Sequence, residues 1–380
     1  MAEPNNEVVI VANRGFALAS SRKKLIAHLV GYGYRVSIIT KQDEYQEELE
    51  EIGAHVINAN FDRGGVSLLK DVKALFQLIR IYRAKKPILI HHFHAKPIIF
   101  GNFAALFSPK STVINNFEGL GYPFTQKSFL YFVSAAAYFI LMKRSSASIF
   151  LNPDDRDLFT SKKWIKPERA YLVLSPGVDV LKFSPNENRP TPPSQDLKVV
   201  MAGRLLWSKG VREFANVCKT IRAQHPNVRF QIAGEWDVSH PDAITETDLE
   251  TMQSDSGVEF LGYVSDMPNK LKDTDIFVLP TRYREGVPRV ILEAQASGVP
   301  VITTDVPGCR DAVLDGKTGF VVPPNDDKAL EERILILIED TEKRLVFGKR
   351  ATQLAVEEFD IDAVTKYQLN VYKAAGLPIS

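Results

Sequence analysis

Two glutamates eight positions apart, Glu285 and Glu293, have the types and spacing that could bind an extended polar ligand. Pro288 between them suits the first turn of a helix, so the sequence predicts a helix from there to about Ser297, with Gly298 as its C-cap. Glu285 then precedes the helix, and Glu293 lies in its second turn, roughly 8 Å along the axis from Pro288. A helix N-terminus, which can bind phosphate, would stand between two carboxylates. The alternative is a pair of solvated carboxylates.

A second group of residues suits an anion. The segment GRLLWSKGVREF (203–214) carries Arg204 and Lys209 in a predicted strand-to-helix loop that ends at Gly210. Side-chain cations beside the free N–H groups of a helix N-terminus are typical of a phosphate site. Arg204 can hold two oxygens in a bidentate fork, whereas Lys209 acts as a point charge. Two solvated loop cations are the alternative, because this spacing occurs often by chance.

The elements that must position these residues follow an α/β pattern. Short β-branched runs alternate with helical patterns, which predicts parallel sheets. The predicted strands are 8–13, 35–40, 88–93, 112–117, 148–152, 197–203, 229–234, 258–262, 275–280, 300–304 and 319–323. A segment rich in Pro, Asn and Ser, 183–196, interrupts the alternation.

The length predicts two domains, because 380 residues exceed the ~250–300 at which one hydrophobic core stops growing. We expect a Rossmann-like N-terminal domain over 1–185, a linker over 186–196 and a Rossmann-like C-terminal domain over 197–360. The final segment, 361–380, is expected to hold a helix that can pack back on the N-terminal domain.

Open α/β sheets bind ligands beyond the carboxyl ends of their strands. That rule selects one set of candidate positions in each half of the chain. They are Gly15, His94, Glu118 and Asn152 in the first half, and Arg204, Glu235, Glu285 and the segment DVPGCRD in the second.

Charge is distributed unevenly although the net charge is only +1. Residues 1–190 have an excess of Lys and Arg, and residues 191–380 an excess of Asp and Glu. A basic first half predicts an anionic partner such as phosphates or a membrane surface, with solvated charge as the alternative. Cys218 and Cys309 fit no metal or disulfide spacing, and the N-terminus shows no signal peptide, so we expect a cytoplasmic protein.

The longest apolar run, FLYFVSAAAYFILM (129–142), ends at Lys143 and Arg144. Fourteen residues are too few for the ~20 of a transmembrane span. The run predicts either a buried core helix or a helix that enters a membrane interface through its aromatic face.

The second half resembles the donor domain of the family 4 glycosyltransferases. The resemblance covers most of residues 197–330 and rests on three segments in order: GRLLWSKGV, YREGVPRVILEAQASGVPVITTDVPGCRDAV and DGKTGFVVPPND. It implies a retaining enzyme of the GT-B fold, in which two Rossmann-like domains face each other across a cleft.

The resemblance also implies residue roles in the donor site. Arg204 and Lys209 would bind the diphosphate of a nucleotide sugar, Glu285 the hydroxyls of the donor sugar and Glu293 the ribose. The Gly286–Val287 backbone would lie near the β-phosphate or the sugar. In this family cationic side chains and helix dipoles offset the leaving group's charge, so no metal is expected.

Gly15 follows the first strand, where the family uses glycine to let the loop approach the donor phosphate. The family often has a glycine pair there, and the segment NRGFALASS has only one. The absence of GxGxxG also opposes a dinucleotide site.

The first half resembles enzymes that extend sugars on polyprenyl-diphosphate carriers, including bacterial capsule and O-antigen transferases. The segments are HFHAKPIIFGNFAA, NNFEGLGYPF, SIFLNPDDRDLF and VLSPGVDVLKFSP. Many relatives carry a histidine after the fourth strand, where this sequence has Glu118. Glu118 therefore becomes a candidate for orienting or deprotonating the acceptor hydroxyl, or else it is a capping loop carboxylate. His94 is either a core histidine or part of the acceptor side.

Together these features predict a retaining, metal-independent glycosyltransferase without a cofactor. It would move a hexose or N-acetylhexosamine, with N-acetylgalactosamine as the best guess, from a UDP-sugar to a polyprenyl-diphosphate-linked saccharide. It would work at the cytoplasmic face of the membrane as a peripheral protein, with no nucleic-acid partner. The alternatives are a GT-B sugar-nucleotide epimerase, a glycogen-synthase-like polymerase, and a non-catalytic nucleotide-sugar-binding subunit.

Overall fold

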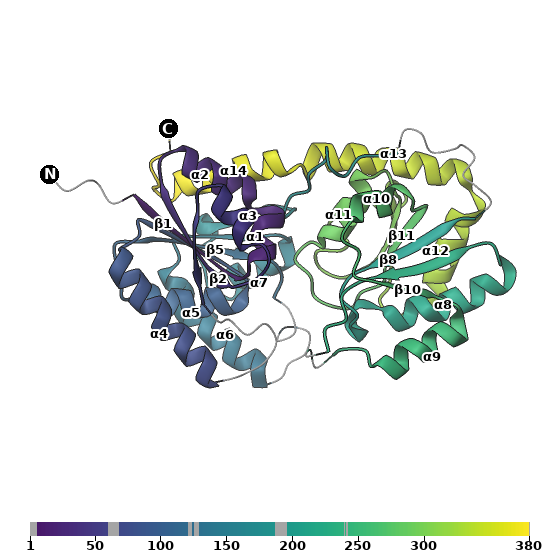
Figure 1. Cartoon of the computed structure of the whole chain (residues 1–380), viewed down its shortest axis with the longest axis horizontal. Helices are drawn as coiled ribbons and strands as arrows, with labels where there is room; N and C mark the ends of the chain where they lie inside the picture. Colours follow the sequence, from purple (N-terminus) through teal and green to yellow (C-terminus); the bar gives the residue numbers. More distant parts are fainter. Residues whose placement is uncertain are drawn as a thin grey trace. The chain divides into compact units, whose positions relative to one another are not determined.

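The chain forms two compact units, which are residues 1–176 with 361–380 (unit 1) and residues 177–360 (unit 2) (Figure 1). The computed structural model describes residues 6–59, 68–120, 124, 129–186, 196–238, 240 and 242–379. Most of the predicted linker, 186–196, lies outside the described residues.

The first segment of unit 1 ends at Pro176, earlier than the predicted boundary at residue 185. The boundary differs from the prediction because the chain from Gly177 onward packs with unit 2. Val178 bridges to Asp360, and its N–H donates to the carbonyl of Phe359 over 2.9 Å. The C-terminal residues from Ile361 onward belong to unit 1.

Within the described residues, the strands of unit 1 form a parallel sheet in the order β3-β2-β1-β4-β5-β6-β7. The centre of β1 is a buried apolar run, as expected of a parallel strand covered on both faces. The strands are β1 (Glu7–Arg14), β2 (Arg35–Lys41), β3 (His55–Asn58), β4 (Leu89–Phe93), β5 (Thr112–Phe117), β6 (Ala147–Phe150) and β7 (Ala170–Leu172).

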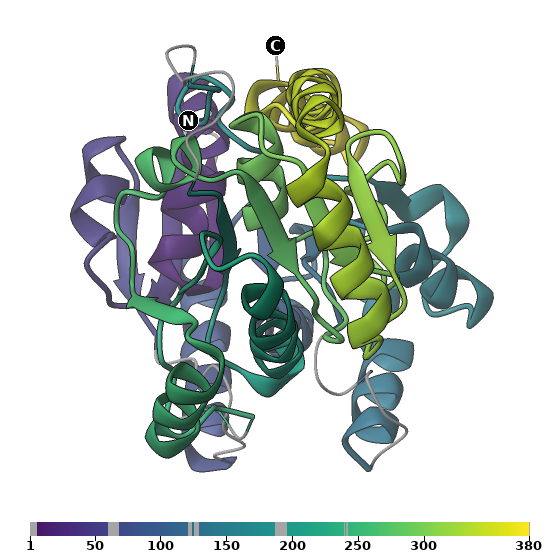
Figure 2. The same ribbon diagram turned by 90° about the vertical axis from the view of Figure 1, so that its right-hand side faces the viewer.

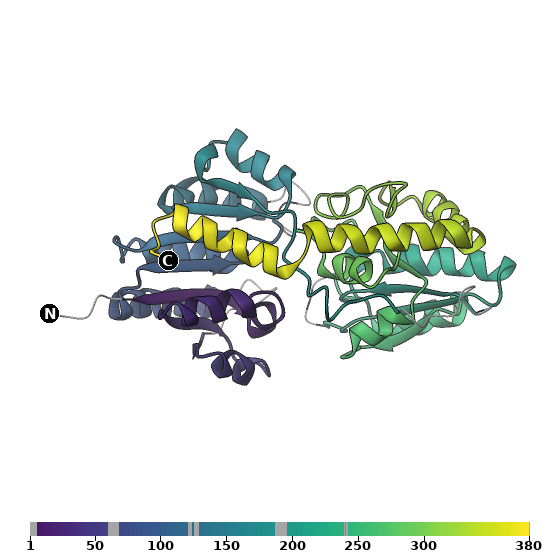
Figure 3. The same ribbon diagram turned by 90° about the horizontal axis from the view of Figure 1, so that it is seen from above.

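Helices cover both faces of this sheet, with α4 and α5 below it and α1, α2 and α14 above it in Figure 1. Leu78 and Tyr82 of α4 pack with Val9, Val11 and Ile90 of the sheet. Helix α14 contacts α2, beside which it lies in Figure 3. The helices are α1 (Gly15–Ser21), α2 (Lys23–Gly31), α3 (Gln46–Glu51), α4 (Leu68–Lys85), α5 (Ala95–Ala105), α6 (Phe129–Leu141), η2 (Met142–Arg144), α7 (Pro153–Ser161), η3 (Pro167–Arg169) and α14 (Ile361–Ala374).

Unit 2 repeats this arrangement. Its described strands form a parallel sheet in the order β10-β9-β8-β11-β12-β13. They are β8 (Lys198–Ala202), β9 (Arg229–Ala233), β10 (Glu259–Gly262), β11 (Ile276–Leu279), β12 (Val301–Thr304) and β13 (Gly319–Val322). Each strand predicted from the sequence is present in the two units, with ends that differ by at most two residues.

The helices of unit 2 pack against its sheet and against one another. In Figure 2 the yellow-green α12 stands in front of the sheet, and it contacts β12, β13 and α8. The helices are η4 (Trp207–Lys209), α8 (Val211–Gln224), α9 (Glu246–Ser256), α10 (Met267–Lys272), α11 (Arg289–Ala296), α12 (Asp327–Glu339) and α13 (Thr341–Glu358). The predicted helix between the two glutamates is confirmed as α11 with Pro288 as its N-cap; its C-cap is Ser297 rather than Gly298, which follows with φ +76°.

Each sheet has one topological switch point, where the strand order reverses direction. In unit 1 it lies between β1 and β4, and in unit 2 between β8 and β11. Ligands in such folds bind beyond the carboxyl ends of the strands at this point. His94 directly follows β4, and Arg204 closely follows β8, so the fold places predicted site residues at both positions.

The apolar run 129–142 forms α6 and the start of η2, and it has two different faces. Ser134, Tyr138 and Leu141 are buried, and Tyr138 packs edge-on against Phe117 of β5. The opposite face is exposed and carries Phe129, Phe132, Val133, Ala136 and Ile140. The core interpretation is therefore right for one face only. Across the described parts of the chain, no helix is both long and apolar enough to cross a bilayer.

Candidate functional site

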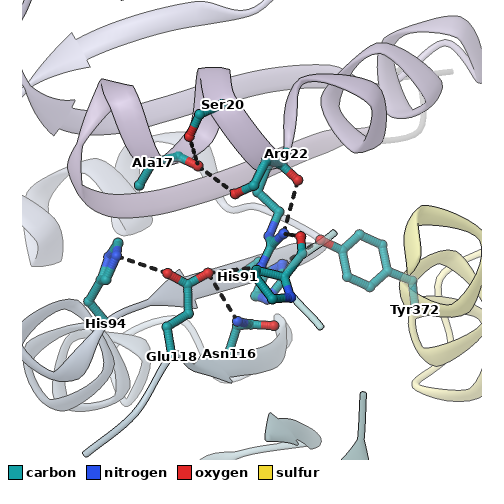
Figure 4. A network of polar contacts seen from close by, with 10 residues as sticks. Ala17, Ser20, Arg22, His91, His94, Asn116, Glu118 and Tyr372 are labelled. Atoms are coloured by element: carbon teal, nitrogen blue, oxygen red, sulfur yellow. Dashed lines mark hydrogen bonds and ion pairs between the residues drawn. The ribbon is translucent and has the colours of Figure 1, made fainter. Parts of the chain in front are cut away.

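In unit 1, Glu118 and His94 lie together beyond the ends of β5 and β4 (Figure 4). The Nε2 atom of His94 is 3.1 Å from Oε2 of Glu118. The Nδ2 group of Asn116 donates to Oε1 of Glu118 over 3.4 Å. The parallel pairing of β4 with β5 brings the two strand ends side by side, which explains the contact between residues 24 positions apart. The chain from residue 121 to 128, residue 124 excepted, lies outside the described residues.

His94 is held in an unusual backbone conformation. Its φ is +70° and its ψ is 160°, a region that residues with a Cβ rarely adopt and that costs of order 1–3 kcal/mol. Its Nδ1 atom and Oδ1 of Asn116 are buried, and neither has a hydrogen-bond partner among the described residues. Strain and unused polar atoms beside a partly exposed carboxylate are typical of a binding or catalytic site rather than of a satisfied core.

Arg22 completes this group, and the sequence analysis did not find it. Its side chain is 1% exposed, and its Nη2 group donates to Oε1 of Glu118 over 2.8 Å. The only signal in the sequence was the run Arg22-Lys23-Lys24, which is typical of a solvated surface. Lys23 and Lys24 do lie at the surface, where they pair with Glu48 and Asp362.

Gly15 begins α1 directly after β1, as the strand-to-helix prediction requires. The carboxylate of Asp43 lies against it and accepts a hydrogen bond from the N–H of Phe16 over 3.2 Å. A Cβ at Gly15 would stand 2.4 Å from Oδ1 of Asp43, so a larger residue there would displace this acidic side chain. The approach of a donor phosphate to Gly15 stays a prediction.

In unit 2, Lys209 and Glu285 form an ion pair although they were predicted to bind different parts of a ligand. Their side chains are only 12% and 13% exposed. Lys209 also lies 5.5 Å from the ring centroid of Tyr283. The loops after β8 and β11 meet because these strands are neighbours at the switch point, and Arg282 N–H donates to the carbonyl of Ser208 over 2.8 Å between them. A cation and a carboxylate thus lie together beyond the carboxyl ends of two neighbouring strands.

The Gly286–Val287 backbone is packed closely by the segment after β12. A Cβ at Gly308 would stand 1.7 Å from the carbonyl oxygen of Gly286, and Gly308 has φ +83°. Val287 is buried. Burial raises the pKa of the neighbouring Cys309 thiol, and the charge of Glu285 adds to that effect. Cys309 is therefore an uncharged core residue, and the loop that carries Glu285 and Gly286 is fixed by its neighbours.

Glu293 and Arg204 each have an oppositely charged neighbour of their own. The carboxylate of Glu293, a buried residue, accepts from Nη2 of Arg289 over 3.0 Å within α11. Nη1 of Arg204 lies 3.6 Å from Oδ2 of Asp237. Arg204 and Lys209 pair with different carboxylates, Asp237 and Glu285, so a shared diphosphate stays a prediction. Among the described residues, no group of three or more His, Cys, Asp or Glu side chains could hold a metal ion.

Two protein families match the two halves of the chain. Residues 183–354 match the family described as "Glycosyl transferases group 1", and residues 11–152 match the one described as "Glycosyl transferase 4-like". The chain is a glycosyltransferase of this kind. The family resemblance and the enzyme class predicted from the sequence are confirmed.

Individual relatives extend this result over the whole glycosyltransferase. It is 28% identical over 379 residues to the N,N'-diacetylbacillosaminyl-diphospho-undecaprenol alpha-1,3-N-acetylgalactosaminyltransferase of Campylobacter jejuni, covering 95% of this chain and 97% of that enzyme. It is 27% identical to the UDP-Gal:alpha-D-GlcNAc-diphosphoundecaprenol alpha-1,3-galactosyltransferase of Escherichia coli, covering 78% of each. The crystal structure of HepE from Anabaena in complex with UDP-glucose has a TM-score of 0.79 at 18% identity, covering 97% of this chain and 99% of that one. The predicted GT-B fold is thereby confirmed.

Proposed function

We propose that this glycosyltransferase moves a hexose or N-acetylhexosamine from a UDP-sugar to a saccharide carried on polyprenyl diphosphate, with retention of anomeric configuration. The observation that carries the proposal is the likeness, over 95% of the chain, to an enzyme named for a diphospho-undecaprenol-linked acceptor. The E. coli relative has a name of the same type and a UDP-sugar donor. N-acetylgalactosamine stays the best guess for the sugar.

The proposed step joins the acceptor hydroxyl oxygen to the anomeric carbon and breaks the bond from that carbon to the β-phosphate oxygen. The hydroxyl proton passes to the leaving phosphate oxygen, so UDP is the second product. In unit 2, Lys209, Arg204 and the N-terminus of α11 would take the diphosphate charge, which would make a metal unnecessary. Donor binding would exchange the Lys209–Glu285 ion pair for contacts of Lys209 with phosphate and of Glu285 with sugar hydroxyls.

UDP release from a panel of UDP-sugars, measured with and without polyprenyl-diphosphate-linked glycans, tests the proposal. Release that requires one donor and one acceptor together would support it and name both substrates. UDP-sugar binding without release from any pair would instead favour a nucleotide-sugar-binding subunit.

Replacing Glu293 by Ala should weaken UDP binding about 10- to 100-fold, because a charged hydrogen bond to the ribose is lost. Calorimetry with UDP and with 2′-deoxy-UDP measures this directly. Wild type should prefer UDP, and the variant should lose that preference. Glu213→Ala is the matched control, since Glu213 is also an Arg-paired glutamate of unit 2. Unchanged UDP affinity in Glu293→Ala would remove the ribose role.

We further propose that the exposed face of α6 attaches the enzyme to the inner face of the cytoplasmic membrane. The exposed residues recur at the spacing of one helical face, and exposed Lys143 follows at the end of the helix. A helix with an aromatic face and adjacent cations suits a lipid interface with anionic headgroups. This arrangement would bring a lipid-linked acceptor to unit 1.

Replacing Phe132 and Ile140 together by Ser should lower binding to anionic vesicles about 10-fold or more, because two large apolar side chains lose their burial in lipid. Co-sedimentation measures the bound fraction. Leu181→Ser is the control, since Leu181 is 86% exposed but lies in unit 2. Transfer to a water-soluble short-chain acceptor should stay unchanged. Equal vesicle binding by wild type and the double variant would contradict attachment through α6.

A further inference from the structure

Arg22 is the most deeply buried charge beside the predicted acceptor-side residues. It stands between α1, which ends at Ser21, and α2, which begins at Lys23. The helical path breaks at Arg22, where φ is −127° and ψ is 1°. This break directs its side chain inward while the side chains of Lys23 and Lys24 remain at the surface. A buried guanidinium must be matched by acceptors, so the identity of its acceptors indicates what it is for.

The guanidinium of Arg22 joins the carboxylate to the main chain of unit 1. Nη2 donates to Oε1 of Glu118 over 2.8 Å, and Nη1 donates to the carbonyl of Pro176 over 2.5 Å and to that of Ser21 over 2.9 Å. Pro176 is the last residue of the first segment of unit 1. The planar fork of arginine can serve several acceptors at fixed angles, which a lysine cannot do. Glu118 is thereby linked to the end of α1 and to the end of the first segment of unit 1.

Aromatic side chains also lie near Arg22, and Figure 4 labels two of them, His91 and Tyr372. The guanidinium carbon of Arg22 lies 5.2 Å from the ring centroid of Phe93. His91 and Tyr372 of α14 share a buried hydrogen bond nearby. Burial holds the pKa of His91 well below its usual range, and the charge of Arg22 acts in the same direction. His91 is therefore neutral and adds no competing positive charge.

We infer that Arg22 is a positioning residue, which holds the Glu118 carboxylate beside His94 in the orientation that the transfer reaction needs. The inference rests on the proposed function of Glu118 and extends it to a side chain that would not itself touch the substrate. Oε1 accepts from Arg22 and Asn116, and Oε2 lies 3.1 Å from Nε2 of His94. The two oxygens would therefore have different roles. Oε1 would hold the carboxylate in place, and Oε2 would lie on the side of His94, where the site is partly exposed.

A double-mutant cycle of Arg22→Met and Glu118→Gln tests this inference in the full-length enzyme. Arg22→Met alone should lower kcat about 10- to 100-fold with the UDP dissociation constant unchanged within about 3-fold, because the charged residues proposed to bind the donor lie in unit 2. In the Glu118→Gln background the same substitution should cost less than about 3-fold, since its target has already been lost. Equal losses in both backgrounds would show that Arg22 acts independently of Glu118 and would overturn the inference.

Arg22→Lys keeps the charge and guards against a failure of the Met variant to fold. It should fall between wild type and Arg22→Met in kcat, because one ammonium cannot serve both Glu118 and Pro176 in the same geometry. Lys23→Met is the matched control, a neighbouring ion-paired cation whose side chain is 40% exposed. It should leave kcat unchanged. Wild-type kcat in both Arg22 variants would overturn the inference.

A measurement that needs no activity separates this inference from the proposed function. Nuclear magnetic resonance of the histidine ring carbons, with the His94 signal identified by its loss in His94→Asn, reports the surroundings of that ring. Arg22→Met and Glu118→Gln should both move the His94 signal, while Lys23→Met should not. If Glu118→Gln moves the signal and Arg22→Met does not, the positioning role is wrong, whether or not the enzyme transfers any sugar tested.

Discussion

Replacing Glu285 by Gln should lower the rate of sugar transfer about 10²- to 10³-fold, while UDP affinity stays equal or becomes slightly tighter. Gln keeps the size of the side chain but removes the charge that would hold the donor sugar's hydroxyls during bond breaking. It also weakens the pair with Lys209, and a released Lys209 is better placed to meet a diphosphate. The expected result is therefore a large loss in kcat without a loss in nucleotide binding.

The measurement is kcat by UDP release together with the UDP dissociation constant by calorimetry. Glu213→Gln is the matched control, because Glu213 pairs with Arg282 in the same unit and its side chain is also 13% exposed. It should leave both quantities within about 3-fold of wild type. Transfer by Glu285→Gln at the level of this control would remove Glu285 from the reaction.

A second comparison separates the two partners of the ion pair. Lys209→Met should weaken UDP binding, because its role is proposed at the diphosphate, whereas Glu285→Gln should not. If the ion pair only stabilised the loop, Lys209→Met and Glu285→Gln should change UDP affinity in the same direction. Either substitution would then leave one buried charge without its partner. Opposite effects on UDP affinity would thus indicate ligand contacts rather than stabilisation of the loop.

The sequence predicted the framework well because the central strands of parallel α/β proteins are continuous apolar segments. β1 and β5 were predicted to within one residue at each end. The two strands that were missed are β3 (His55–Asn58) and β7 (Ala170–Leu172), which are the edge strands of unit 1. Both are short and partly exposed, so neither has the continuous apolar pattern that identifies a central strand.

Pairings between distant residues could not be predicted from local patterns. Lys209 and Glu285 were each found as strand-end residues, but their contact depends on β8 lying next to β11. Arg22 was passed over because three consecutive cations have the same local appearance, and only tertiary packing decides which of them enters the core. Sequence rules thus identify residues at the carboxyl ends of strands, and the strand order decides which of these residues contact each other.

The two units pair a carboxylate at a strand end with a cation in different ways. In unit 2 the pair is Lys209 with Glu285, two residues that would both contact the donor. In unit 1 the cation is Arg22, whose side chain is only 1% exposed, whereas that of Glu118 is 20% exposed. Glu118 rather than Arg22 is therefore expected to contact a ligand. This difference is why Glu118 is expected to affect transfer and not donor binding.

Replacing Glu118 by Gln should lower transfer about 10²-fold or more, with the UDP dissociation constant unchanged. The amide has only one acceptor oxygen, so when that oxygen accepts from Arg22 an NH2 group faces His94 in place of the second carboxylate oxygen. The acceptor hydroxyl would lose the group that orients it. Glu48→Gln is the matched control in unit 1, since Glu48 also pairs with a cation, Lys23, but lies at the surface.

The slow hydrolysis of the UDP-sugar by water, measured without acceptor, distinguishes the acceptor side from the donor side. If Glu118 acts on the acceptor, Glu118→Gln should retain hydrolysis at close to the wild-type rate while transfer falls. If it acts on the donor sugar, both rates should fall together. Transfer close to the wild-type rate would end the proposed role of Glu118, and His94, which contacts it at 3.1 Å, would then be the remaining candidate beside it.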